Sequence, residues 1–224
     1  DDDDNDGLDD DEDNCPRVPN NGQVVPLTPG NDGWMRDWLV LGPLEGVKGP
    51  SGCMPTADRL GVDDATAEVG LGFAAEGSPW QVFRSTDDRL ALGTLLGGTA
   101  PRENYLAAWV RSPTGPRDLT WSLGPDDGVR AWFDEEVVLE DQRCQGTIVD
   151  RNEVPVSLGA GWHRLLIKVY DQGGGWGLYA RFKDGDTPVT DLDISLQPGG
   201  PWAPDQTDTD GDGIGDVCDE TPAG

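Results

Sequence analysis

The strongest constraint on how this chain folds is one frame of acidic residues that occurs at both of its ends. At the C-terminal end the frame consists of Asp208, Asp210, Asp212, Gly213, Ile214, Asp216 and Asp219, at loop positions 1, 3, 5, 6, 7, 9 and 12. At the N-terminal end the same positions hold Asp2, Asp4, Asp6, Gly7, Leu8, Asp10 and Asp13. Calcium takes six to eight oxygens, which a short loop supplies from alternating carboxylates, a sharp turn at glycine and a following backbone carbonyl. The sequence therefore predicts two calcium loops, with Leu8 and Ile214 giving their carbonyls.

The charge distribution supports this interpretation. Net charge is −27, and residues 1–14 and 205–220 hold 17 of the 43 acidic residues without one Lys or Arg. Such a run repels itself and stays extended unless cations neutralise it. The alternative is a solvated acidic tail, but two frames in register favour bound calcium. The same charge repels phosphate, so nucleic acid is not an expected partner.

Two helical calcium-binding families are rivals for these loops. An EF-hand has a bidentate Glu at position 12 and a helix on each side, whereas both loops here have Asp at position 12. A dockerin also needs flanking helices. Pro16, Pro19 and Pro204 lie beside the loops and oppose helices there.

The ends resemble thrombospondin type 3 repeats. The resemblance is carried by Asp13-Asn14-Cys15-Pro16, by Ala203-Pro204-Asp205-Gln206 and by Gly215-Asp216-Val217-Cys218-Asp219, and covers about 40 residues. In the family these parts are contiguous, whereas here about 180 residues separate them. We interpret this as one repeat, residues 1–20 and 203–224, interrupted by an inserted domain at 21–202. Insertion at a surface turn is tolerated when the termini of the inserted domain lie close together.

Four cysteines are present: Cys15, Cys53, Cys144 and Cys218. An even number of cysteines in an acidic chain with one histidine indicates disulfides and an oxidising compartment, and the residues alone allow three pairings. The resemblance to the repeats implies a Cys15–Cys218 bond, which leaves Cys53–Cys144 within the insert.

The insert is predicted to be all-β. Its short alternating runs, bounded by Gly and Pro, are typical of a β-sandwich. Expected strands are Trp38–Leu41, Gln81–Ser85, Tyr105–Arg111, Leu119–Leu123, Val129–Phe133, Arg164–Tyr170 and Leu178–Phe182. Turns are expected at Gly124–Gly128 and Gly173–Gly175. The expected fold class is thus a jelly-roll-like β-sandwich inserted into an irregular, calcium-bound repeat.

Two stretches of the insert resemble protective-antigen-type and galactose-binding-like sandwich domains. They are Gly124–Asp134, with its Asp126-Asp127-Gly128 sequence, and Ala160–Val169. In sugar-binding members the paired aspartates hold a calcium that grips sugar hydroxyls, and the resemblance implies that role for Asp126 and Asp127. The alternative is that Asp126-Asp127-Gly128 is a plain hairpin turn.

Tryptophans are the other candidates for sugar contact, because an exposed indole ring can stack on a sugar. Trp109, Trp121, Trp132 and Trp162 lie in or beside expected strands and are assigned to the core. Trp176 follows three glycines and is expected as an exposed platform, with Gln172 and Asp171 adding hydrogen bonds. The alternative is that Trp176 packs over the edge of a sheet.

The sequence gives little support for catalysis. Its one histidine, His163, lies in an expected strand, where a structural role is favoured over that of a base. No Gly-x-Ser-x-Gly elbow and no phosphate-binding glycine loop occurs. We therefore expect that the protein is not an enzyme.

Two functions fit these observations. The first is an extracellular calcium-binding module that adheres to, or binds, a glycan or a surface protein from a calcium-stiffened spacer. The second is a structural subunit of an extracellular fibre, sheath or surface layer, joined to neighbouring repeats or to copies of itself. No apolar run approaches the ~18 residues of a membrane span. The acidic start indicates a fragment of a longer precursor, and 13 Arg against 3 Lys suggest a GC-rich bacterial coding sequence. With the oxidising compartment that the cysteines indicate, the expected location is secreted or on the surface of a bacterial cell.

Overall fold

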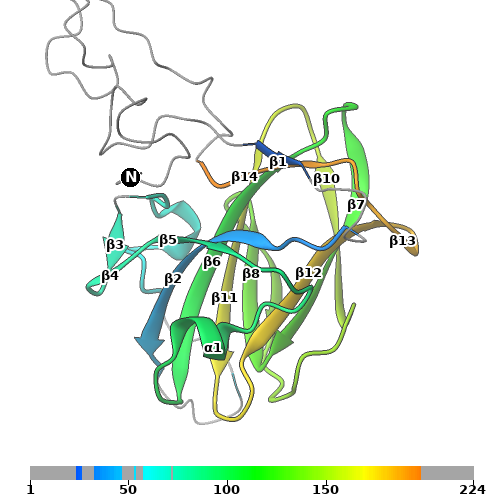
Figure 1. Cartoon of the computed structure of the whole chain (residues 1–224). Helices are drawn as coiled ribbons and strands as arrows, with labels where there is room; N and C mark the ends of the chain where they lie inside the picture. The colour runs from blue at the N-terminus through cyan, green and yellow to red at the C-terminus, as the bar shows by residue number, and fades with distance from the viewer. Residues whose placement is uncertain (1–23, 27–32, 47–52, 54–57, 72, 198–224) are drawn as a thin grey trace, which may run out of the picture.

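Alternating strands assemble the central part of the chain into two facing β-sheets (Figure 1). The computed structural model describes residues 24–26, 33–46, 53, 58–71 and 73–197. The two predicted calcium loops and the predicted Cys15–Cys218 bond lie outside these residues. Within the described part of the chain, no helix has the length and apolar character of a membrane span.

The larger sheet has eight strands, all paired antiparallel. Its main order is β1 (Val24–Pro26), β14 (Asp193–Ser195), β6 (Arg102–Arg111), β11 (His163–Asp171), β8 (Gly128–Phe133) and β9 (Glu136–Asp141). The other two strands are β2 (Asp37–Glu45), which also pairs with β6, and β5 (Gln81–Arg84), which pairs with β2.

The smaller sheet has four antiparallel strands. Its order is β10 (Asn152–Leu158), β7 (Arg117–Asp126), β12 (Gly177–Asp184) and β13 (Thr187–Pro188). Outside the two sheets are the hairpin of β3 (Ala74–Ala75) and β4 (Ser78–Pro79), a 3-10 helix at Asp64–Thr66 and the short helix α1 (Leu92–Leu96). The prediction of an all-β sandwich is confirmed.

Each of the seven expected strands is found, but the sequence analysis did not predict β9 and β10. In β10, Val154, Val156 and Leu158 are buried in strict alternation with exposed residues. Pro155 occupies one of the exposed positions, and a proline inside a strand argues against a central place in the sheet. The structure explains its presence, because β10 is the edge of the smaller sheet and pairs only with β7.

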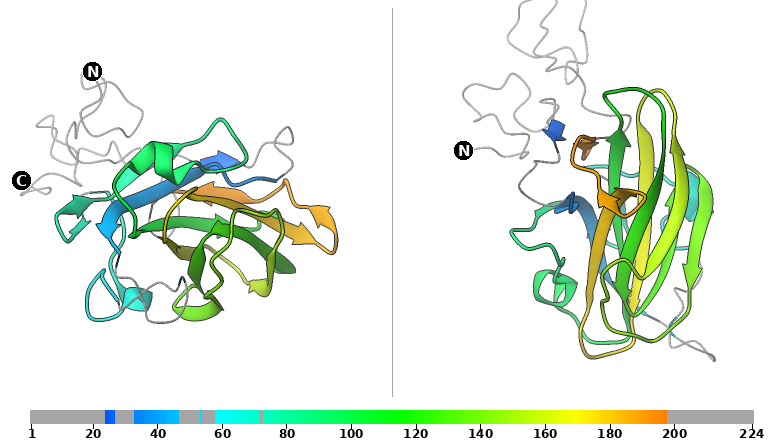
Figure 2. Two further views of the ribbon diagram at one scale, coloured as in Figure 1. Left: turned by 90° about the horizontal axis from the view of Figure 1, so that it is seen from below. Right: turned by 90° about the vertical axis from the view of Figure 1, so that its right-hand side faces the viewer.

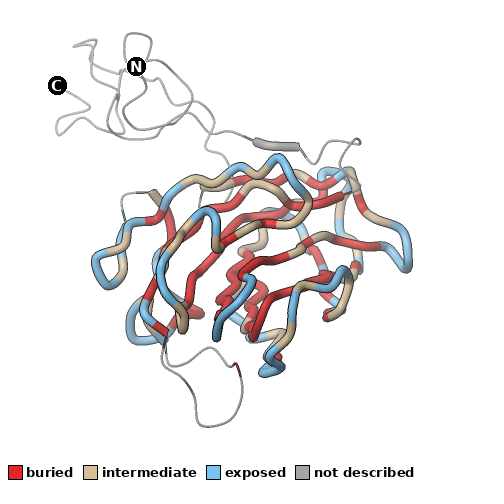
Figure 3. Tube along the Cα trace, turned by 60° about the horizontal axis from the view of Figure 1, so that its bottom comes forward, coloured by how far each residue is buried: buried red, intermediate tan, exposed pale blue. Residues whose placement is uncertain are grey.

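The main core lies between the two sheets. Leu165, Ile167 and Val169, which alternate along β11, point into it from the larger sheet. Trp121 of β7 and Phe182 of β12 enter it from the smaller sheet, with their rings stacked at a centroid distance of 6.2 Å. Figure 3 shows the resulting pattern, with buried stretches along the strands and exposed stretches at the turns.

A second apolar layer covers the outer face of the larger sheet. Trp80 joins Trp109, Trp132 and Leu166 there, all of them buried. Both faces of β11 are therefore covered, which explains why its stretch from Leu165 to Tyr170 is apolar on both sides apart from Lys168.

Strands β1 and β14, which begin and end the described body, lie side by side. Val24 pairs with Ser195 and Pro26 pairs with Asp193. The first residue of β1 and the last residue of β14 are therefore partners in the sheet, and such close placement of its two ends is what an inserted domain requires. Because β14 pairs with the end of β6 at Trp109–Arg111, the β1–β14 pair lies at one end of the sandwich (Figures 1 and 2).

Candidate functional site

The Asp126–Asp127 pair lies where the chain crosses from one sheet to the other. Asp126 ends β7 in the smaller sheet and Gly128 begins β8 in the larger sheet, so that Asp127 alone makes the crossing. The peptide bond between the two aspartates is cis. The alternative of a plain hairpin turn at Asp126-Asp127-Gly128 is therefore wrong, because β7 and β8 do not pair. The expected turn at Gly124–Gly128 is also too long, because Gly124 and Pro125 belong to β7.

The crossing lies at the end of the sandwich opposite to β1 and β14. Gly128 pairs with Tyr170, and Tyr170 pairs with Glu103 near the start of β6. β14 pairs with the other end of that strand. At about 3.3 Å per residue, some 25 Å of β6 separates the aspartate pair from the point where the flanking segments leave.

Both carboxylates are buried and are held in place by backbone donors. Asp126 and Asp127 are each 7% exposed. The N–H of Gln172 donates to Asp127 Oδ2 at 2.8 Å, and the N–H of Asp127 donates to the carbonyl of Tyr170 at 2.8 Å. The nearest described cation to Asp126 is Arg89, whose Nη2 lies 3.8 Å from Asp126 Oδ2, beyond hydrogen-bonding distance.

Burial makes these two carboxylates harder to ionise than ordinary aspartates. Burial first, and then the charge of Asp127, raise the pKa of Asp126 from 3.8 to about 6, although Arg89 opposes the shift. Burial also raises the pKa of Asp127, and the charge of Asp171 adds to the effect, against the hydrogen bond from Gln172. Raised pKa values at two adjacent, buried carboxylates make the pair a candidate functional site.

These shifts predict how the stability of the calcium-free body changes with pH. An aspartate whose pKa is higher in the folded state binds its proton more tightly there, so folding is favoured below about pH 4 and loses this contribution as pH rises through 6. We expect Asp126→Asn to raise the free energy of unfolding at pH 7 in chelator by about 1–3 kcal/mol, with little effect at pH 4. Urea unfolding at both pH values measures this, and an equal effect at both would contradict the assigned cause.

A disulfide and a glycine fix the loops around the pair. Cys53 and Cys144 are bonded, with their Cα atoms 5.0 Å apart, as expected for the insert. The side-chain oxygen of Gln172 lies 3.2 Å from Cys53 Sγ. A methyl group on Gly128 would overlap the carbonyl oxygen of Cys53. Gln172, a predicted site residue, is thus brought to the same place as Asp127.

Trp176, in contrast, is not the exposed platform that the sequence predicts. Its side chain is 2% exposed and belongs to the core between the sheets. The guanidinium of Arg102 lies over the ring, 4.5 Å from its centroid, and Arg102 Nε donates to Asp171 Oδ2 at 2.7 Å. The three glycines before Trp176 make the expected turn between β11 and β12, but the chain then directs the indole inward.

The other aromatic assignments can be compared directly with the structure. Trp109, Trp121 and Trp132 are buried as expected, and Trp162 is half-buried against the outer layer. His163 is hydrogen-bonded on both ring nitrogens: Nε2 accepts from the N–H of Gly159 at 2.8 Å, and Nδ1 lies 2.9 Å from Asp134 Oδ2. Because Nε2 is an acceptor, Nδ1 carries the proton and donates to Asp134. Its contacts are those of a structural histidine.

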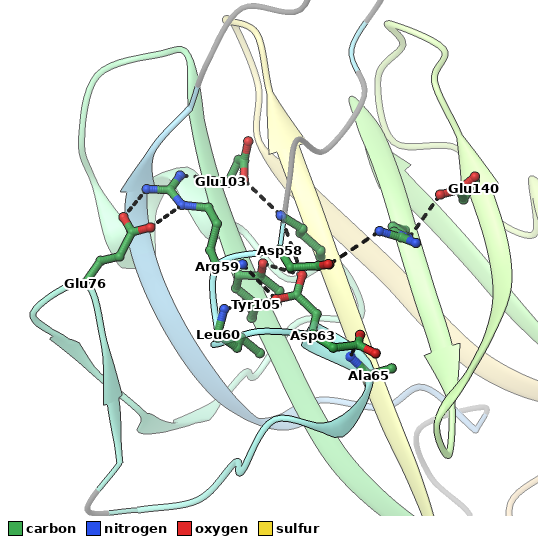
Figure 4. Close-up of polar contacts among 12 residues, drawn as sticks. Asp58, Arg59, Leu60, Asp63, Ala65, Glu76, Glu103, Tyr105 and Glu140 are labelled. Atoms are coloured by element: carbon green, nitrogen blue, oxygen red, sulfur yellow. Dashed lines mark hydrogen bonds and ion pairs between the residues drawn. The ribbon is translucent and has the colours of Figure 1, made fainter.

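A second group of charges lies beneath the 58–66 segment on the outer face of the larger sheet (Figure 4). Lys168 Nζ lies 3.4 Å from Glu103 Oε2 and 3.7 Å from Asp64 Oδ2, and all three side chains are fully buried. Asp64 also accepts from the Tyr105 hydroxyl at 2.7 Å and from the N–H of Arg59 at 2.8 Å. These contacts join the segment to the sheet, so we assign the cluster a structural role.

The described side chains constrain how a cation could be held. Among the residues that the structure describes, no group of three or more acidic, histidine or cysteine side chains is arranged to hold a metal ion. Two carboxylates at Asp126 and Asp127 fit calcium only if carbonyl, amide, water or ligand oxygens complete its six to eight contacts. A site of this type leaves coordination positions for the hydroxyl groups of a ligand.

Two residues of the site were not singled out from the sequence. Arg89 and Thr147 come from two separate loops, and no local motif marks either of them. Asp171, which the sequence analysis names together with Gln172, is the last residue of β11. Asp171 is fully buried and forms an ion pair with Arg102, so it stabilises the structure around the site.

Comparison with known proteins gives a family for the ends and distant likenesses for the body. The family described as the thrombospondin type 3 repeat matches residues 1–23 and 207–221. The comparison with curated proteins found no match.

Three solved structures of low identity are similar to part of the chain. A PA14 sugar-binding domain from an RTX adhesin is 16% identical, with a TM-score of 0.49 over 73% of this chain and 100% of that one. The PA14 domain of the antifreeze protein MpAFP is 17% identical, with a TM-score of 0.37 over 49% of this chain and 54% of that one. A β-glucosidase from Kluyveromyces marxianus is 14% identical, with a TM-score of 0.36, and only 14% of its chain is covered. The chain thus spans about half of the antifreeze-protein domain, and likenesses this distant say nothing about its ligand.

Proposed function

We propose that the sandwich is an extracellular carbohydrate-binding or adhesive module, whose site is a calcium ion held by Asp126 and Asp127. The observation that carries the proposal is the pair itself: two adjacent, buried carboxylates at a loop end, with no described cation within hydrogen-bonding distance. Leaving two such charges together costs stability, and a divalent cation would offset that cost. Bound calcium would supply open coordination positions for vicinal sugar hydroxyls.

The surroundings of the pair support the proposal. Backbone donors orient Asp127, and the Cys53–Cys144 bond holds the 142–149 loop beside it, so the carboxylates are fixed before a ligand arrives. Disulfides persist in oxidising compartments, which supports an extracellular location. Because Trp176 is buried, apolar contact with a sugar would come from elsewhere. The exposed side chains of Ile148 and Val149 lie on the same loop as Thr147.

The ends have a separate proposed role. We propose that residues 1–20 and 203–224 form one calcium-bound repeat, closed by Cys15–Cys218, into which the body at 21–202 is inserted. The pairing of β1 with β14 supports this arrangement, because it brings the two segments to the same end of the sandwich. The repeat would then present the Asp126–Asp127 site at the far end of the body.

The test is glycan binding by the full chain with and without calcium. We expect wild-type protein to bind in calcium, and Asp127→Asn to reduce binding at least 100-fold because it removes a ligand charge. Titration calorimetry should show one calcium site fewer in Asp127→Asn, with the sites of the ends retained. Asp118→Asn is the matched control, since Asp118 lies at the opposite end of β7 and bonds Ser157.

Two results would contradict the proposal. One is an unchanged number of calcium sites in Asp127→Asn. The other is calcium-dependent polymerisation without glycan binding, which would support the role of a structural subunit in a fibre, sheath or surface layer.

A further inference from the structure

Arg89 lies beside the aspartate pair but makes no hydrogen bond to Asp126. Its Nε donates to Thr147 Oγ1 at 2.9 Å, which leaves the two Nη groups directed elsewhere. Nη2 is 3.8 Å from Asp126 Oδ2, and the side chain is 33% exposed. The next residue, Leu90, is joined to Leu178 of β12 by backbone hydrogen bonds of 2.9 and 3.1 Å. Arg89 is therefore held beside the aspartate pair by the hydrogen bond of its side chain and by the backbone of the following residue.

Two glycines keep the space around this guanidinium clear. A methyl group on Gly177 would come within 2.6 Å of Arg89 Nη2 and 2.8 Å of the Leu90 carbonyl. A methyl group on Gly175 would come within 2.8 Å of Asp126 Oδ2 and lie 3.7 Å from Arg89 Nη2. Glycine at both positions thus lets Arg89 lie close to the backbone beside Asp126.

The charges of the side chains at the site indicate which charge a ligand should carry. Asp171 is paired with Arg102 at 2.7 Å, so it does not balance Arg89. Calcium would neutralise Asp126 and Asp127, and the guanidinium of Arg89 would remain as one excess positive charge. A ligand with one negative charge would complete the balance, and a guanidinium binds a carboxylate through two parallel hydrogen bonds.

We propose that Arg89 makes the site selective for sugars that carry a carboxylate, such as uronic acids. This inference rests on the proposed function, because it takes the aspartate pair as the sugar site. The carboxylate would bind the Nη groups of Arg89 while sugar hydroxyls bind beside the aspartates. The net charge of −27 opposes dense polyanions, so a single acidic sugar is the favoured ligand.

The experiment compares D-glucuronate with D-glucose in calcium, measured by titration with the full chain. We expect wild-type protein to bind glucuronate about tenfold more tightly than glucose, since charge-assisted hydrogen bonds add at least that factor. Arg89→Gln should lose this preference, so that it binds glucuronate and glucose with about equal affinity. Arg89→Lys, which keeps the charge but not the planar fork, should be intermediate. Arg117→Gln, at the opposite end of β7, is the control.

The outcomes separate this inference from the proposed function. If wild-type protein binds neither sugar but binds another glycan, or binds both sugars equally, the selectivity inference is overturned and the site remains. If the preference for glucuronate persists in Arg89→Gln, the carboxylate of the sugar is bound by calcium and not by Arg89. The inference is then also overturned. If Arg89→Gln lowers calcium affinity and weakens both sugars alike, Arg89 serves only the aspartates. If no glycan binds at all, both the proposed function and the selectivity inference are overturned.

Discussion

Lys168→Met is expected to lower the free energy of unfolding of the body by about 3–5 kcal/mol. Lys168 is the buried cation between the carboxylates of Glu103 and Asp64, at 3.4 and 3.7 Å. Methionine has a similar volume and fills the space, but it leaves two negative charges buried without that cation. Burial already lowers the pKa of Lys168, and the two carboxylates oppose this shift. Urea unfolding of the wild type and the variant measures the effect.

A partial reversal identifies electrostatics as the cause. Adding Glu103→Gln to Lys168→Met removes one of the stranded charges, so the double variant should be more stable than the single one. Arg117→Met is the control, because its pair with Asp191 is half exposed and such pairs contribute about 1 kcal/mol or less. If the double variant is no more stable than Lys168→Met, lost packing rather than charge explains the effect.

Gly128→Ala is the second large effect, at about 3 kcal/mol or more. The added methyl group would overlap the carbonyl oxygen of Cys53, and Cys53 has little freedom to move away. It is bonded to Cys144, and its N–H donates to the carbonyl of Gln142 at 3.0 Å. Because the same strand end carries the aspartate pair, glycan binding should weaken together with stability. Thermal unfolding and glycan titration in calcium measure the two effects.

Releasing Cys53 should reduce this cost. In a Cys144→Ala background under reducing conditions, Gly128→Ala should cost at least about 1 kcal/mol less, since the Cys53 backbone can then shift. Gly146→Ala is the matched control from the neighbouring loop, because a methyl group there meets no atom within 4 Å. An equal cost of Gly128→Ala with and without the disulfide would show that the clash is relieved in some other way.

Much of the fold was predictable because strand patterns are local. Alternation along β11 predicts which residues face the main core, and the glycines after Asp171 predict the turn before β12. β10 was missed because it contains Pro155. An edge strand tolerates proline in its middle, and sequence alone does not show which strand is the edge.

The site was only partly predictable because its residues meet through the topology. A pair of aspartates before glycine has the same local pattern in a hairpin and in a crossing between two sheets. Only the pairing of β7 with β12 and of β8 with β11 distinguishes the two. Trp176 failed for a related reason, since three preceding glycines predict a loop but not the direction of the following side chain. Arg89 and Thr147 are 58 positions apart, and nothing in either local sequence indicates their contact.

The pairing of β1 with β14 determines how the body responds to tension. A pull on residues 24 and 195 in opposite directions acts across the β1–β14 pairing, starting at the pair of Val24 and Ser195, so the residue pairs open one after another. Such a geometry yields at far lower force than strands sheared lengthwise. If the flanking segments are bridged to each other, the load passes between them and never reaches the sandwich. A tether built in this way could hold under flow while the aspartate pair, at the far end of the body, stays undistorted.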